Sequence, residues 1–219
     1  MGKVARAPWG PHQAWFKVSR SAIHLTGMDA GQLRELCRSY EPFVALGEPD
    51  GDALGEGIEC RACRLAAPPE LPPADLIRDG QYAPRAVQSP NGIELTGVNF
   101  RARVPLSPQH SPGWLGVVEA RELVQANVIE NVLRVFSAHQ ALRRGGVVLH
   151  SAGLVIDGRA LLFAGRSGAG KTTLTRKGHG AGAQVLSDDI NLVLPGAVGY
   201  EAHAVPFTGE FGRTLAHPG

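Results

Sequence analysis

Residues 159–173, Arg-Ala-Leu-Leu-Phe-Ala-Gly-Arg-Ser-Gly-Ala-Gly-Lys-Thr-Thr, decide how the fold of this chain is interpreted. The five apolar residues at 160–164 are typical of a short buried strand. A loop with the spacing G-x-x-x-x-G-K-[ST] follows at once, and its glycines let backbone N–H groups approach a phosphate closely. The stretch therefore predicts a nucleotide phosphate-binding loop. The residues predicted to contact the nucleotide are Gly165, Arg166, Ser167, Gly168, Ala169, Gly170, Lys171, Thr172 and Thr173.

Two side chains at the end of this loop carry the predicted chemistry. Lys171 supplies positive charge for the outer phosphates, and the Thr172 hydroxyl is placed to bind Mg²⁺. A helix is expected over residues 172–183, and the positive end of its dipole would face the phosphates. The alternative, a glycine-rich turn with an exposed lysine, does not explain the ordered Gly-Lys-Thr-Thr. We therefore expect ATP and Mg²⁺ as cofactors.

The loop strand is entered through a hairpin. Asp157-Gly158 is a strong turn signal, and it is expected to join strands at 154–156 and 161–164 in antiparallel fashion. A further strand is expected at 147–151. Because parallel neighbours flank the loop strand in the commonest P-loop folds, this hairpin indicates a less common P-loop architecture.

Acidic residues follow the next expected strand, at 184–186. Asp188 and Asp189 stand where a P-loop protein needs a carboxylate for Mg²⁺. Two adjacent carboxylates can divide the work, one binding the metal and the other accepting a proton from an attacking hydroxyl. His150 ends an apolar run, and its imidazole could reach Asp188 and orient it. The competing interpretations are an ordinary Asp-Asp turn and a structural histidine.

The first half of the chain differs in composition from the second. Most of the 16 prolines precede Trp114, which disfavours long helices and favours short strands. A hairpin is expected across Ser19-Arg20, and Asp29 is a candidate N-cap for a helix reaching Tyr40. We therefore predict a small β-rich accessory region over residues 1–113 and the nucleotide-binding domain over 114–219.

Two other segments bear on this division. A long helix is expected over residues 119–144, with Gly145-Gly146 as its stop. Cys60 and Cys63 form a C-x-x-C pair that could indicate zinc or redox chemistry, but a second pair at zinc-ribbon spacing is missing, so we favour free, partly buried thiols.

The overall composition limits the classes of partner. The net charge of +2 gives no argument for nucleic acid or an anionic membrane. An apolar run long enough to span a bilayer is not found, and neither is a secretory signal, so we expect a cytoplasmic protein. The last residues follow a loop directly, and we expect the sequence to be truncated at its C-terminus. The sequence leaves open whether the protein forms a homo-oligomer.

Residues 147–194 resemble the kinase domain of HPr kinase/phosphorylase, which shares its P-loop core with phosphoenolpyruvate carboxykinase. The resemblance rests on four segments in a fixed order: His150-Ser151-Ala152, the Asp157-Gly158 hairpin, Ser167-Gly168-Ala169-Gly170-Lys171-Thr172, and Ser187-Asp188-Asp189. It implies an α/β fold with a P-loop nucleoside triphosphate-binding core of mixed sheet, of the carboxykinase type.

The resemblance also implies roles for single residues. Asp188 would accept the proton of the substrate hydroxyl with His150 beside it, and Asp189 would serve the metal with Thr172. Glu210 is the match for a later acidic residue that helps with the metal. The glycine-rich signature of the region that contacts the protein substrate in HPr kinases is not found, so HPr itself is not inferred.

Three functions follow from these patterns. The leading one is an ATP-dependent kinase that phosphorylates a hydroxyl of a protein, a peptide or a small molecule, with Lys171, Asp188 and His150 in catalysis. The second is an ATP-binding regulatory module without transfer activity. The third, a carboxykinase-like enzyme, should require a cluster of Arg and Lys for the substrate, which we do not see.

Overall fold

The computed structural model describes residues 6–48, 56–71, 77–78, 81–125, 128–207 and 209. The chain forms two compact units, Met1–Phe136 and Ser137–Gly219. The division predicted from composition lies after residue 113. The structure instead assigns the segment 114–136 to the first unit. Both units combine helices with sheet, and the chain is a mixed α/β protein.

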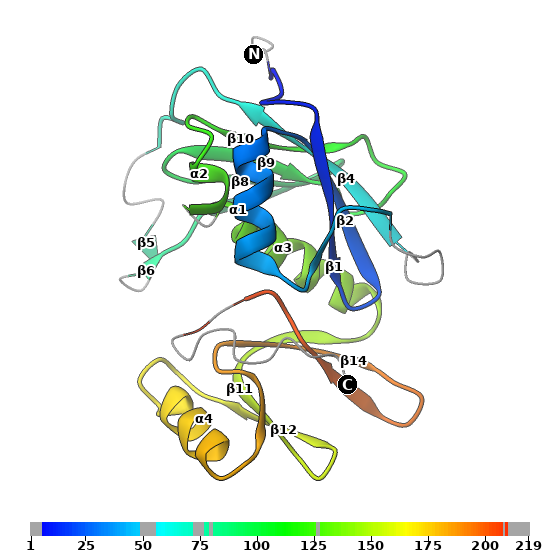
Figure 1. Cartoon of the computed structure of the whole chain (residues 1–219), viewed down its shortest axis with the longest axis vertical. Helices are drawn as coiled ribbons and strands as arrows, with labels where there is room; N and C mark the ends of the chain where they lie inside the picture. Colours follow the sequence, from blue (N-terminus) through cyan, green and yellow to red (C-terminus); the bar gives the residue numbers. More distant parts are fainter. Residues whose placement is uncertain are drawn as a thin grey trace. The chain divides into compact units, whose positions relative to one another are not determined.

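The first unit is built on an eight-stranded sheet in the order β3-β1-β2-β4-β10-β9-β8-β7 (Figure 1). Its parallel pairs are β2 with β4 and β4 with β10, and the other neighbours are antiparallel. The β2–β4 pair is parallel because the chain crosses over through α1 between them. The strands are β1 His12–Val18, β2 Ser21–Met28, β3 Val44–Ala45, β4 Glu56–Arg64, β7 Arg85–Ser89, β8 Gly92–Thr96, β9 Phe100–Val104 and β10 Gly113–Val117, and a separate pair is β5 Ile77–Arg78 with β6 Gln81–Tyr82.

Local chemistry explains how the sheet and its helix begin. The predicted hairpin across Ser19-Arg20 is confirmed, because β1 and β2 are antiparallel neighbours with Val18 opposite Ser21. Asp29 caps α1 (Ala30–Tyr40) as predicted, because its carboxylate accepts the Gln32 N–H while the Gln32 side chain accepts the Asp29 N–H. The Tyr40 ring meets Phe16 edge to face at 5.1 Å, so α1 covers one face of the sheet.

The helix predicted over 119–144 is two helices in the described residues, α2 (Glu122–Gln125) and α3 (Val128–Arg143). The first begins later than predicted because the Glu122 carboxylate accepts the Glu119 N–H, which leaves Glu119 before the helix. The predicted stop is confirmed. Gly145 has φ +73°, and the Gly145 and Gly146 N–H groups bond back to Leu142 and Ala141 in a Schellman motif.

The second unit carries a five-stranded sheet around β11, and every strand pair described in it is antiparallel. The mixed sheet predicted for this part of the chain is therefore found in the first unit instead. The second sheet is antiparallel because the hairpin places β11 between β12 on one side and β13 and β14 on the other, and all three run opposite to β11. The elements are β11 Val147–Ile156, β12 Arg159–Ala164, α4 Lys171–Gly180, β13 Gln184–Ser187, β14 Ile190–Pro195 and β15 Tyr200–His203.

The Asp157-Gly158 hairpin is confirmed, and both residues have positive φ, of 50° and 72°, as a type I′ turn requires. The strands predicted at 147–151 and 154–156 are one continuous strand, β11. The buried strand predicted at 160–164 is not buried. Leu161 and Phe163 are 43% and 38% exposed. β12 is also an edge strand, since it pairs with β11 alone among the described strands. None of the described helices is long and apolar enough to cross a membrane.

Candidate functional site

Chain direction brings the predicted site residues to one edge of the second sheet. β12 and β13 are both antiparallel to β11 and flank it, so their carboxyl ends lie at the same edge. The glycine-rich loop (residues 165–170) follows the first of these ends, and Asp188-Asp189 follows the second. β11 runs the other way and contributes His150 there, next to the Ser151–Ala164 pair.

These segments surround a cavity of about 520 Å³ in the second unit. Nine of the predicted site residues line it, together with one glycine to which the sequence assigned no role. The lining residues are His150, Ser167, Gly168, Gly170, Lys171, Thr172, Thr173, Asp188, Asp189 and Gly209. The structure thus gathers the loop, both aspartates and His150 at one place, while Glu210 lies outside the described residues.

The glycine-rich loop has the backbone shape that its sequence predicts. Gly168 and Gly170 have φ of +79° and +86°, a region that other residues rarely adopt. A Cβ at either position would meet nothing within 4 Å, so both glycines face open space. The Lys171 ammonium group donates to the carbonyls of Gly165, at 2.9 Å, and Arg166, at 3.1 Å. The positive charge is therefore held within the loop, at the beginning of α4.

Asp188 is directed at the start of α4. Its side chain accepts a hydrogen bond from the Thr172 hydroxyl at 3.1 Å, and the residue is only 4% exposed. Gly209 lies against this carboxylate, since a Cβ there would come within 2.6 Å of Asp188 Cγ. Sequence reasoning missed Gly209, and only the fold shows that a glycine is needed there.

His150 contacts the other aspartate. Its Nε2 lies 3.3 Å from Asp189 Oδ1, and the backbone of Asp189 accepts the Ser151 N–H. The prediction placed His150 beside Asp188, so the observed pair is a correction. It arises because Asp188 and Asp189 form the bend between β13 and β14, where their side chains diverge. The Asp188 side chain turns toward Thr172, and the Asp189 side chain toward His150.

Buried polar residues to which the sequence assigned no role hold this edge in place. The Ser187 hydroxyl accepts the N–H groups of Asp189 and Ile190, both at 3.2 Å, which fixes the turn of the aspartate pair. The Asn191 amide donates to the Ser151 carbonyl at 2.6 Å and to its hydroxyl at 3.0 Å. The resemblance includes Ser187 without giving it a role, and an asparagine within a strand such as Asn191 carries no signal of its own.

The side-chain chemistry of these residues suits a nucleotide bound together with Mg²⁺. Mg²⁺ prefers oxygen ligands and usually takes one or two carboxylates, completing its shell with water and phosphate oxygens. Thr172, Asp188 and Asp189 offer such oxygens beside a loop whose glycines leave room for phosphate. In the described part of the chain, no group of three or more His, Cys, Asp or Glu side chains is arranged to hold a metal.

The cysteine pair lies in the first unit, on β4, and both thiols are free and buried. Burial raises the pKa of Cys60 to about 12, helped by the nearby Glu59 carboxylate. Burial also raises the pKa of Cys63, to about 11. Both thiols therefore hold their protons at neutral pH, as expected of cysteines that pack in a core.

Comparison with known proteins gives one similarity. Residues 117–216 match the family model described as SynChlorMet cassette protein ScmC. The matched segment is somewhat less than half of the chain, and it includes His150, the glycine-rich loop and both aspartates. No curated protein and no solved structure matches the chain.

Proposed function

We propose that this protein is an ATP-dependent kinase that transfers a phosphoryl group to a hydroxyl of a protein, peptide or small-molecule acceptor. The second unit would be a P-loop core of the HPr kinase type. The observation that carries the proposal is the convergence of Lys171, Thr172, Asp188, Asp189 and His150 on one cavity, from three separate segments. A glycine-rich turn without function would not require carboxylates and an imidazole to meet it.

Each residue has a role that its contacts support. Bound Mg-ATP would supply the phosphoryl group and a metal that neutralises phosphate charge. The glycine-rich loop and the start of α4 would offer backbone N–H groups to the phosphates, and the Lys171 charge, held by the loop carbonyls, would lie beside them. Such catalysis consists mainly of positioning and charge compensation.

The contacts of the two aspartates support an exchange of the roles that the resemblance implies. Asp188 shares a hydrogen bond with the Thr172 hydroxyl, the arrangement expected of two groups that serve one metal. Asp189 lies against His150, which can orient its carboxylate for accepting the proton of the acceptor hydroxyl. We therefore assign the metal to Asp188 with Thr172, and the proton to Asp189 with His150 as its positioning residue.

The test measures binding and transfer separately on the full chain. Binding uses a fluorescent ATP analogue titrated at several Mg²⁺ concentrations, and transfer uses mass spectrometry of serine- and threonine-containing peptides and small alcohols incubated with Mg-ATP. Lys171→Ala should abolish binding, while Lys177→Ala, an exposed lysine further along α4, should not. Asp188→Asn should raise the Mg²⁺ requirement, and Asp189→Asn should keep binding and lose transfer.

Other outcomes would change the conclusion. If Asp188→Asn keeps its Mg²⁺ dependence and loses only transfer, the original order of the roles holds. Nucleotide binding by the wild type without transfer to any acceptor would favour the regulatory module instead. If the wild type does not bind the analogue at all, both functions are wrong.

A further inference from the structure

The first unit contains a second cavity, of about 410 Å³, which the kinase chemistry does not use. It lies on the face of the eight-stranded sheet opposite to the one that carries the core. Alternation along β1 shows this, because Ala14 and Phe16 are buried in the core whereas Trp15 between them is half-exposed. We call this cavity the open-face pocket.

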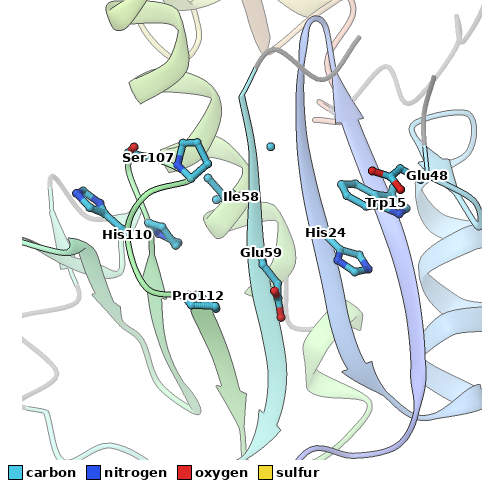
Figure 2. A pocket seen from close by; sticks show the side chains of 11 residues that line it. Trp15, His24, Glu48, Ile58, Glu59, Ser107, His110 and Pro112 are labelled. Atoms are coloured by element: carbon cyan, nitrogen blue, oxygen red, sulfur yellow. The ribbon is translucent and has the colours of Figure 1, made fainter. Parts of the chain in front are cut away.

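Strand register places three chemically distinct side chains in one row across this face. Trp15 of β1 pairs with His24 of β2, and His24 pairs with Glu59 of β4. The Trp15 and His24 rings stack at 4.3 Å with 8° between their planes. Figure 2 shows the row, with Glu48 near Trp15 and with Ser107, His110 and Pro112 across the pocket. A flat π surface and a carboxylate thus stand side by side.

The opposite wall is the segment 105–112, which joins β9 to β10. Three of its residues are prolines, which restrict the backbone. The His110 N–H donates to the Ser107 carbonyl at 3.1 Å, and the Arg103 guanidinium donates to the Pro112 carbonyl at 2.9 Å. This wall is therefore preformed, and a ligand would meet little ordering cost on entering the pocket.

The charge of the lining selects the class of ligand. Glu48 and Glu59 bring two carboxylates, and no Lys or Arg is among the described residues that line the pocket. Neither carboxylate forms an ion pair with a residue that the structure describes. A cation beside a tryptophan ring and a carboxylate gains from the ring quadrupole and from the opposite charge together.

We propose that the open-face pocket binds an organic cation, a guanidinium or an ammonium group, between the Trp15–His24 stack and the carboxylates of Glu48 and Glu59. This site does not depend on the proposed kinase activity. A lysine or arginine side chain of a peptide and a free amine both present this chemistry, and the experiment below separates them.

The test follows the indole N–H signal of Trp15 in nuclear magnetic resonance spectra of the full chain, with Trp15→Phe to assign it. Nα-acetylarginine amide is titrated at pH 8, and Nα-acetylcitrulline amide serves as its uncharged isostere. We expect the arginine compound alone to shift the signal, with millimolar affinity. Glu59→Gln should weaken the binding of the arginine compound about fivefold, which is the contribution of one partly exposed ion pair. Glu48→Gln should weaken it too, and Glu70→Gln, an exposed glutamate outside the pocket, should not.

The remaining outcomes are decisive as well. Equal shifts by the arginine and citrulline compounds, or wild-type affinity in both Glu48→Gln and Glu59→Gln, would overturn the proposal, and so would the absence of any shift. Agmatine then identifies the source of the cation. Tighter binding of Nα-acetylarginine amide than of agmatine points to a peptide side chain, and the reverse order points to a free amine.

Discussion

The substitution Gly178→Ala tests directly how α4 packs on the second sheet. By propensity alone, Gly178→Ala should stabilise a helix by up to about 1 kcal/mol. In the structure, however, the new Cβ would lie 2.5 Å from Leu154 Cδ1, 3.2 Å from Cδ2 and 3.4 Å from Cγ. Leu154 is 3% exposed, so its whole side chain must move within a packed region. Overpacking of this kind costs about 1–3 kcal/mol, which gives a net loss of about 1 kcal/mol.

The matched control is Gly180→Ala, at the end of the same helix, where a Cβ would meet nothing within 4 Å. We expect that variant to gain about 0.5 kcal/mol. Hydrogen–deuterium exchange of peptides covering α4 and β11 in the full chain measures the free energy of opening of this unit alone. The reasoning is refuted if Gly178→Ala protects these peptides as well as Gly180→Ala does. In a Leu154→Ala background the obstacle is gone, and Gly178→Ala should then become stabilising.

Two further predictions concern other parts of the chain. The raised thiol pKa values of Cys60 and Cys63 mean that the unfolded chain, whose thiols ionise near pH 9, loses protons before the folded chain does. Stability of the first unit should therefore be fully present below pH 9 and fall above it, by up to about 1.4 kcal/mol per pH unit for each thiol. Urea unfolding at pH 8 to 10 should show this slope, and Cys60→Ala/Cys63→Ala should flatten it. Gly209→Ala would push its Cβ onto the Asp188 carboxylate and break the bond to Thr172, so we expect at least a tenfold loss in Mg²⁺-dependent nucleotide affinity with unchanged Mg²⁺-free binding.

Local chemistry could be predicted from the sequence, and long-range pairing could not. The Asp29 cap and the Asp157-Gly158 hairpin each depend on a few neighbouring residues, and both are confirmed. The exposure of β12 depends on what covers its two faces, and no pattern within its five apolar residues reports that. The partner of His150 and the position of Glu59 beside His24 likewise depend on register between strands that are distant in sequence. Periodicity shows which residues share a face, and register decides which of them meet.

The register of β13 shows why the aspartate pair needs an irregular strand. Val185 pairs with Leu154, which packs against α4, and Asp188 bonds to Thr172, also of α4. Residues three apart on a regular strand face opposite sides, so Val185 and Asp188 could not both face the helix. The register shift between Gly153 and Leu154 leaves Leu186 as an extra residue in β13. This bulge and the bend at Asp188-Asp189 beyond the end of β13 together let both side chains face the helix. A regular strand would force a choice between burying Val185 in the core and directing Asp188 at the glycine-rich loop.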